Sequence, residues 1–182
     1  MGKIKLFEKK LKSKEIFKGS TVGFNIDTIT LPNGKTANRE YLTHPGAVAV
    51  LPVLKNGDIV FVKQYRYPIR KVTYEIPAGK LHSKKDNFLK RAIAELKEET
   101  GYSAKKLNHL IDFWPTPAFS NELLKIYFAD ELKAGKAMPD EDEFLNIEFI
   151  PLDKAMRMIK TGKIKDSKTI IALQSYMLRN RK

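Results

Sequence analysis

The sequence predicts a mixed α/β fold, either α+β or a layered α/β/α domain. Strand-like segments come before and after one central helical pattern, and two further helical patterns close the chain. The length of 182 residues suits one domain with a short appendage, and no internal repeat is apparent. We therefore expect an N-terminal β-hairpin region over 1–44 and a main domain over 45–182.

The N-terminal region carries a strong hairpin signal. Thr21–Leu31 alternates apolar and polar residues, and an Asn33-Gly34 turn separates it from a second strand at Thr36–Thr43. A two-stranded hairpin is only marginally stable alone, so we expect it to pack against another surface.

The main domain begins with apolar strands. Ala47–Leu54 is almost entirely apolar, Asn56-Gly57 turns the chain, and Ile59–Tyr65 is apolar again, which predicts a second hairpin buried on both faces. A short strand is expected at Tyr74–Pro77. Further strands are expected at 107–113, 122–129 and 147–150, and closing helices from Leu152 and from Asp166.

A central helix is expected over Asn87–Thr100. We expect Asp86 to cap its start and Gly101 to adopt the left-handed conformation after its end. Apolar residues at helical spacing predict the face that packs on the core: Leu89, Ala92, Ile93 and Leu96.

Composition narrows the function classes. Thirty-four Lys and Arg against 21 Asp and Glu leave a net charge of +13, which attracts nucleic acid, anionic membranes or phosphorylated metabolites without choosing among them. The absence of cysteine excludes disulfides, thiolate nucleophiles and Cys-ligated metal centres. No apolar run approaches the ~20 residues that span a bilayer, and Met1–Leu11 lacks the features of a secretory signal. We expect a soluble, cytoplasmic protein with no membrane partner.

Three carboxylates share one face of the central helix. Glu95, Glu98 and Glu99 stand at i, i+3 and i+4, and the last two lie where the helix dipole disfavours acids by roughly 0.3–1 kcal/mol each. An oxygen-ligand site for Mg²⁺ or Mn²⁺ would explain the cluster. On spacing alone, a solvated acidic face explains it equally well.

The segment around these carboxylates resembles the Nudix box. The family pattern is Gly, five residues, Glu, seven residues, then Arg-Glu-aliphatic-x-Glu-Glu-x-Gly-aliphatic, and the chain reads Gly79, a loop and a helix, then Glu95-Leu-Lys-Glu-Glu-Thr-Gly-Tyr102. Ala94 replaces the Arg that helps to orient the acidic residues in the family. Asp86 or Lys85 occupies the first Glu position, and the loop after Gly79 is one residue longer.

The resemblance extends over nearly the whole chain and is to the ADP-ribose pyrophosphatase branch of the family. The stretches that carry it are Arg39-Glu40, His44–Val48, Lys63–Pro68, Glu75–Gly79, Pro117–Glu122, Asp140–Phe144 and Gly162–Thr169. It implies a Nudix-type α/β/α sandwich around a mixed sheet. It also implies Mg²⁺-dependent hydrolysis of the pyrophosphate bond of ADP-ribose, or of a related nucleoside diphosphate sugar, to AMP or another nucleoside monophosphate and a sugar phosphate.

The resemblance also assigns expected roles. The metal ligands would be the carbonyl of Ala78 and the carboxylates of Glu95, Glu98 and Glu99, with Glu98 also counted as catalytic. The base would come from the acidic loop, where Glu141 and Glu143 are both candidates. Arg39, Arg66, Glu75 and Phe24 are the expected substrate contacts, the two arginines because a guanidinium fork suits phosphate oxygens or stacks on a purine. A homodimer that exchanges the N-terminal hairpin is expected.

Two alternatives remain at this point. A sugar-nucleotide pyrophosphatase of the GDP-mannose type would use the same metal and acids. A nucleic-acid-binding or regulatory module on the same fold would use the positive charge instead, but the lysines are spread along the chain rather than gathered with aromatic residues.

Overall fold

The computed structural model describes residues 6–141 and 143–180 and divides the chain into two compact units. The smaller unit comprises Met1–Pro45 and Trp114–Glu122, and the larger comprises Gly46–Phe113 and Leu123–Lys182. The start of the expected 1–44 region and Asp142 of the acidic loop lie outside the described residues. Along the described ranges, no helix is long and apolar enough to cross a membrane.

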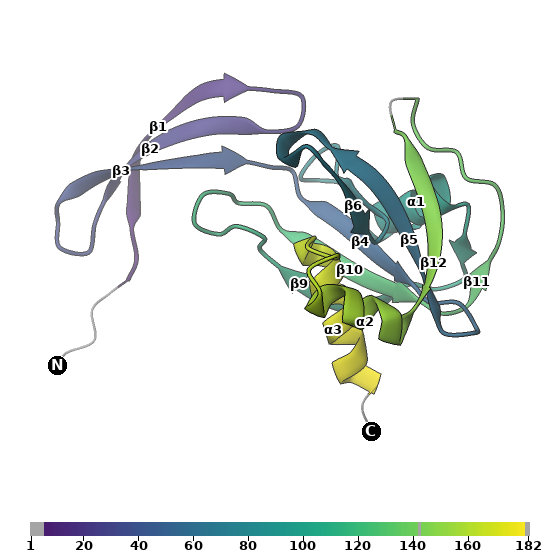
Figure 1. Cartoon of the computed structure of the whole chain (residues 1–182). Helices are drawn as coiled ribbons and strands as arrows, with labels where there is room; N and C mark the ends of the chain where they lie inside the picture. The colour runs from purple at the N-terminus through teal and green to yellow at the C-terminus, as the bar shows by residue number, and fades with distance from the viewer. Residues whose placement is uncertain (1–5, 142, 181–182) are drawn as a thin grey trace. The chain divides into compact units, whose positions relative to one another are not determined.

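The smaller unit is built on a three-stranded antiparallel sheet in the order β1-β2-β3, drawn in purple and blue in Figure 1. β2 (Gly23–Thr30) and β3 (Thr36–Thr43) form the hairpin expected from the Asn33-Gly34 turn. β1 (Lys9–Lys18) was not expected, because it lacks apolar alternation: it contains five lysines and all of its residues are exposed. Lysines on an edge strand oppose pairing with further strands.

The larger unit contains a mixed four-stranded sheet and a three-stranded antiparallel sheet. The first has the order β7-β4-β10-β9, with β4 and β10 parallel and the other pairs antiparallel, and the second has the order β12-β5-β6. Their strands are β4 (Ala47–Pro52), β5 (Asp58–Arg66), β6 (Lys71–Glu75), β7 (Ala78–Lys80), β9 (Asn108–Phe113), β10 (Leu124–Ala129) and β12 (Leu145–Pro151). A two-stranded sheet joins β8 (Ser103–Ala104) to β11 (Leu132–Lys133), and the 3₁₀ helix η1 (Tyr67–Ile69) follows β5.

The second expected hairpin was wrong in its pairing. β4 and β5 are connected through the Asn56-Gly57 turn, but only one isolated bridge, Val53 to Ile59, pairs the two segments, and the strands continue into different sheets. Both segments are apolar because both sheets are buried. The apolar pattern therefore cannot tell whether the two strands pair with each other or lie in different stacked sheets.

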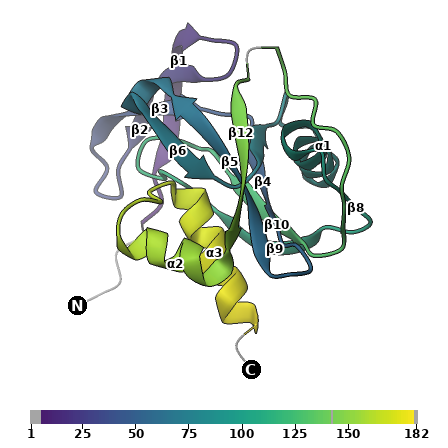
Figure 2. The same cartoon turned by 45° about the vertical axis from the view of Figure 1, so that its right-hand side comes forward.

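Helices cover both sides of the four-stranded sheet, which confirms the α/β/α architecture. α1 (Phe88–Thr100) packs on β4 and β7, whereas α3 (Ser167–Asn180) packs on β4, β9 and β10, and α2 (Leu152–Lys160) contacts α3 and β12 (Figure 2). Along β4, Val48 and Val50 join the core under α1, and Ala49 and Leu51 join the core under the other two helices. This alternation explains why every residue of β4 is buried.

Three local expectations need correction. Ala92 and Leu96 are buried, but the other two members of the apolar stripe, Leu89 and Ile93, are exposed, because the face toward β7 carries Glu95 and Glu99 instead. The cap of α1 is Asn87, whose side chain accepts from the Lys90 N–H at 3.0 Å. Asp86 instead accepts from the N–H groups of His82 and Ser83 in the preceding loop. Trp114, which the sequence leaves either in the core or at a subunit interface with the core favoured, is 62% exposed.

Candidate active site

Two carboxylates of α1 are buried against the strand segment that contains Ala78 and Gly79. Glu95 is 3% exposed and Glu99 is 4% exposed. The Ala78 N–H donates to Glu99 Oε2 at 3.1 Å. A Cβ on Gly79 would lie 1.4 Å from Glu95 Oε1, so the glycine permits the close approach of this carboxylate to the backbone.

Burial and mutual repulsion make these groups hard to ionise. Burial raises the pKa of Glu95 to about 7, with the charges of Glu98 and Glu143 adding to the rise and Arg91 opposing it. Burial raises the pKa of Glu99 to about 8, and the neighbouring charge of Glu95 adds to it. Two buried carboxylates without enough compensating positive charge suit a bound cation.

Arg91 contacts two of these carboxylates and was not singled out by the sequence analysis. It stands one turn before Glu95, and its Nη2 lies 2.5 Å from Glu95 Oε1 while its Nη1 donates to Glu98 Oε2 at 3.2 Å. The pair with Glu95 has poor hydrogen-bond geometry: Arg91 Nε and Glu95 Oε1 are buried without a hydrogen-bond partner in the described part of the chain. Arg91 therefore contacts the acids that the family arginine, here Ala94, would orient. Its i, i+4 spacing to Glu95 was the available signal.

The donor set fits a hard divalent cation, although the side chains are not gathered into a finished ligand cluster. Glu95, Glu99 and the backbone around Ala78 lie together, whereas Glu98 is partly exposed and engaged by Arg91. Across residues 6–141 and 143–180, no group of three or more His, Asp or Glu side chains is arranged to hold an ion. The oxygen-only chemistry fits Mg²⁺ or Mn²⁺, as does the buried Glu95 Oε1, which forms an ion pair with Arg91 but accepts no hydrogen bond from the described residues.

The two candidate bases differ in their surroundings. Glu143 is partly buried, and its charge contributes to raising the pKa of both Glu95 and Glu99, so it lies within electrostatic reach of the buried pair. Glu141 is exposed.

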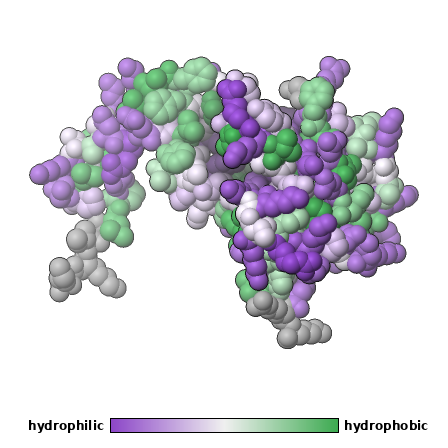
Figure 3. Space-filling model, in the orientation of Figure 1, coloured by the Kyte–Doolittle hydropathy of each residue, from purple (hydrophilic) through white to green (hydrophobic). Residues whose placement is uncertain are grey.

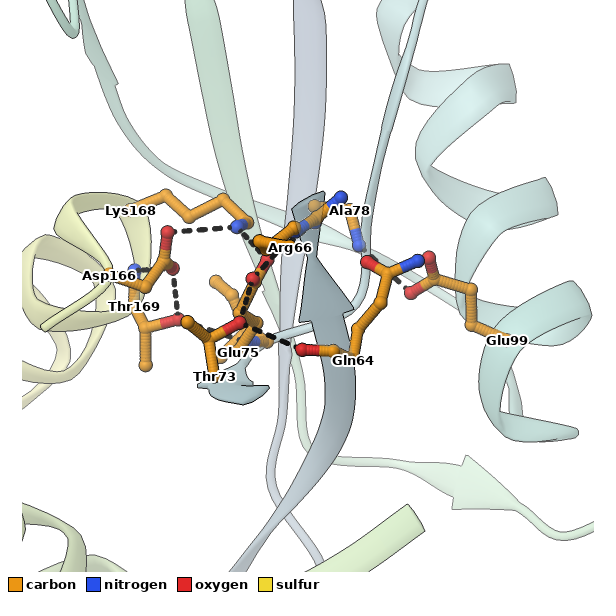
Figure 4. A network of polar contacts seen from close by, with 10 residues as sticks. Gln64, Arg66, Thr73, Glu75, Ala78, Glu99, Asp166, Lys168 and Thr169 are labelled. Atoms are coloured by element: carbon orange, nitrogen blue, oxygen red, sulfur yellow. Dashed lines mark hydrogen bonds and ion pairs between the residues drawn. The ribbon is translucent and has the colours of Figure 1, made fainter. Parts of the chain in front are cut away.

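Arg66 and Glu75 form a tight ion pair, drawn in Figure 4. Arg66 Nε and Nη2 donate to the two oxygens of Glu75 at 2.8 and 2.6 Å, the Thr73 hydroxyl donates to Oε1 at 2.5 Å, and Lys168 Nζ contacts Oε2. Glu75 is 2% exposed. Burial alone would raise the pKa of Glu75, but Arg66 and Lys168 outweigh it and lower this pKa to about 2. The bidentate fork is typical of a fixed guanidinium.

The other two expected substrate contacts belong to the smaller unit. Arg39 donates from Nε and Nη2 to Glu8 at 3.0 and 2.5 Å, and it lines a pocket of about 260 Å³ together with residues 40–41 and 117–121. Phe24 is partly buried on β2, in register with Phe17 and Leu42. Arg66, Glu75 and the carboxylates of α1 all belong to the larger unit.

Comparison with known proteins agrees with this geometry. A family model described as the NUDIX domain matches residues 43–173. The chain is 45% identical to a methanol dehydrogenase activator of Bacillus methanolicus and 40% identical to an ADP-ribose pyrophosphatase of Bacillus subtilis strain 168, in each case over 96% of this chain and 95% of the relative. A crystal structure of an ADP compounds hydrolase superposes with a TM-score of 0.82 at 18% identity, covering 94% of this chain and 93% of that one, which supports the fold.

The family model matches most of the chain, including the segment with Gly79 and the carboxylates of α1. The 40% identity to a relative covers 96% of this chain and 95% of that relative. The chain belongs to the Nudix family.

Proposed function

We propose that the chain is a metal-dependent hydrolase that cleaves the pyrophosphate bond of ADP-ribose, producing AMP and ribose phosphate. The observation that carries the proposal is the buried pair Glu95 and Glu99, which faces the Ala78–Gly79 backbone and lacks sufficient counter-charge. The 40% identical ADP-ribose pyrophosphatase supports the choice of substrate.

Glu95, Glu98, Glu99 and the carbonyl of Ala78 are the proposed ligands of Mg²⁺, for which Mn²⁺ could substitute. When bound, the ion neutralises diphosphate charge and polarises phosphorus for attack by water. The protein contributes the positions of these oxygens: Ala78 holds Glu99 through a hydrogen bond, and Arg91 holds Glu98.

Glu143 is the proposed general base, with Glu141 as the alternative. Its electrostatic influence on Glu95 and Glu99 supports this choice, because a base must stand near the water that attacks beside the metal ligands. Arg66, oriented by Glu75, is proposed to bind a phosphate oxygen of the substrate through the guanidinium edge that Glu75 does not use.

We further propose that the protein is a cytoplasmic homodimer in which Arg39 and Phe24 of the smaller unit contribute to the nucleotide site. Exposed apolar residues on the smaller unit support self-association, among them Phe7, Leu11, Ile16 and Phe17. In the view of Figure 3, hydrophobic residues in green gather on this unit. Sedimentation of the full chain tests the dimer, with a monomer at micromolar concentration contradicting it.

The substrate is tested by product analysis across ADP-ribose, GDP-mannose and NADH at equal concentration with Mg²⁺. We expect ADP-ribose to be cleaved best; if it were among the poorest, the substrate assignment would fail, and preference for GDP-mannose would support the alternative pyrophosphatase. Glu98→Gln and Glu99→Gln should each lose roughly 10²-fold or more in turnover. Salt-sensitive binding to DNA or RNA without any Mg²⁺-dependent turnover would favour a nucleic-acid module instead.

A second candidate function follows from the 45% identical relative, a methanol dehydrogenase activator. The chain could stimulate a dehydrogenase of this kind through the same hydrolytic site. We would measure methanol oxidation by such a dehydrogenase with and without the chain, using Glu99→Gln as the control. Stimulation that disappears in Glu99→Gln would support this role, and no stimulation would exclude it for the dehydrogenase tested.

A further inference from the structure

Lys168 is a buried cation that none of the roles above explains. It is the second residue of α3 and is 9% exposed. Its Nζ contacts Glu75 Oε2 and donates to Asp166 Oδ1 at 3.0 Å. Lysine is almost never buried unless paired, so its position beside Glu75 needs a reason.

The first turn of α3 is also bonded to the strand segment that leads to the metal ligands. Asp166 Oδ2 accepts from the Thr169 N–H at 3.0 Å and from its hydroxyl at 2.6 Å, as a helix-capping aspartate does. Thr169 Oγ1 in turn accepts from the Ile76 N–H at 2.9 Å. Ile76 immediately follows Glu75, and two residues later Ala78 binds Glu99. Figure 4 shows Lys168 reaching Glu75 from α3, with Glu99 approaching Ala78 from α1.

Lys168 helps to hold the carboxylate that orients Arg66. Glu75 Oε2 contacts both Arg66 and Lys168, and Asp166 pairs with Lys168, so the network holds two positive and two negative charges and is neutral overall. Glu75 is therefore held by Arg66 and by Lys168 of α3, and it fixes the guanidinium of Arg66 in turn. The Arg66 side chain is 42% exposed, and its bonds to Glu75 use Nε and Nη2 rather than Nη1.

Arg66 also lies within electrostatic reach of the candidate metal site. The pKa of Arg66 is raised, chiefly by the hydrogen bond to Glu75 against the effect of burial, and the charges of Asp166 and Glu99 add to it.

We propose that Lys168 is a positioning residue that acts through Glu75 to fix the guanidinium of Arg66 for the diphosphate of the substrate. The inference rests on the proposed function for the identity of the substrate, but the arrangement of Arg66 can be measured without one. Lys168 itself does not contact the reacting atoms.

The test compares Lys168→Met with Lys165→Met in the full-length protein. Both changes remove one lysine charge, Lys168 at the second residue of α3 and Lys165 two residues before the helix, but Lys165 is exposed. We expect Lys168→Met to raise the KM for ADP-ribose about tenfold while kcat changes little, as for an interaction made equally in ground and transition states. Lys165→Met should match the parent. Lys168→Gln, which removes the charge but keeps a hydrogen-bond donor, is measured in parallel. If Lys168→Met does not fold, the same change in KM for ADP-ribose is expected of Lys168→Gln.

A double-mutant cycle separates positioning from general stability. In the Arg66→Ala background, Lys168→Met should have no further effect on KM, because the residue through which it acts is gone. An equal effect in both backgrounds would overturn the proposal, as would an unchanged KM in the parent background.

A second readout needs no substrate. Hydrogen exchange of the Arg66 Nε–H, followed by NMR and assigned with Arg66→Lys, should become about tenfold faster in Lys168→Met, because Glu75 no longer holds the guanidinium in one orientation. Unchanged exchange would overturn the proposal. If the parent protein fails to cleave ADP-ribose, the proposed function fails, and this measurement still decides the role of Lys168.

Discussion

Replacing Glu99 by Gln should stabilise the metal-free protein while it removes activity. Glu99 is 4% exposed and its pKa is about 8, against an ordinary value of 4.5. At pH 7.5 the unfolded chain therefore holds an ionised Glu99, whereas the folded chain must keep it protonated. At about 1.4 kcal/mol for each pH unit above 4.5, this requirement costs about 4 kcal/mol of folding free energy. Glutamine does not titrate, and its carbonyl can still accept the hydrogen bond from Ala78.

The sign of the effect sets its pH dependence. Because the pKa is raised in the folded state, the folded protein binds more protons than the unfolded chain, and its stability falls as the pH rises from about 4.5 toward 8. The advantage of Glu99→Gln should therefore be about 1 kcal/mol or less at pH 5 and grow to about 4 kcal/mol near pH 8.

The assay is thermal or urea unfolding in EDTA at pH 5 and pH 8, repeated with saturating Mg²⁺. We expect Glu99→Gln to melt several degrees above the parent at pH 8 without metal, and Mg²⁺ to raise the melting temperature of the parent more than that of the variant. Glu131→Gln, a change at an exposed glutamate, should leave the melting temperature without metal and its increase with Mg²⁺ the same as in the parent. A metal-free Glu99→Gln that is no more stable than the parent at pH 8 would refute the reasoning.

Three further predictions concern the neighbours of this site. Gly79→Ala places a Cβ 1.4 Å from Glu95 Oε1 and should cost roughly 10²-fold in Mg²⁺-dependent turnover with an unchanged circular dichroism spectrum. Arg91→Met leaves the buried Glu95 charge unpaired, so it should lower the free energy of unfolding of the metal-free protein at pH 8 by about 3 kcal/mol. Mg²⁺ should restore much of this loss, and urea unfolding with and without the ion measures both effects. The pKa of Glu75 is lowered to about 2 in the folded protein, so its ionisation contributes about 3 kcal/mol to the free energy of unfolding above pH 4.5. This contribution is lost as the pH falls toward 2. The difference in unfolding free energy between the parent and Glu75→Gln should therefore narrow over that pH range.

Local patterns in the sequence predicted those elements whose signals lie within a few residues. The Asn33-Gly34 hairpin was confirmed because its turn chemistry sets the pairing of β2 and β3. The end of α1 was confirmed at Gly101, which adopts a φ of 75° and donates to the Lys97 carbonyl at 2.9 Å. The mixed α/β/α fold was confirmed because the order of strands and helices leaves few layered arrangements.

Expectations that depended on distant neighbours were less successful. The apolar stripe of α1 was half wrong because two helix positions are buried carboxylates, and helical spacing cannot report what the opposite surface carries. The separation of β4 from β5 was missed because both strands are apolar, and an apolar pattern does not report which strands pair. Arg91 was overlooked because the family pattern drew attention to Ala94, although the arginine contacts the same acids from three positions earlier.

The sequence by itself determined that three carboxylates share one face of α1 and that the chain resembles the Nudix family, because residue spacing and motif identity are properties of the chain alone. Only the tertiary structure decided which of those carboxylates lose contact with water, and that Lys168 meets Glu75 across 93 positions of the sequence. The physical reason is that the free energy of a charge depends on its burial and on the charges nearest to it in space, and both are set when α1, α3 and β6 are brought together.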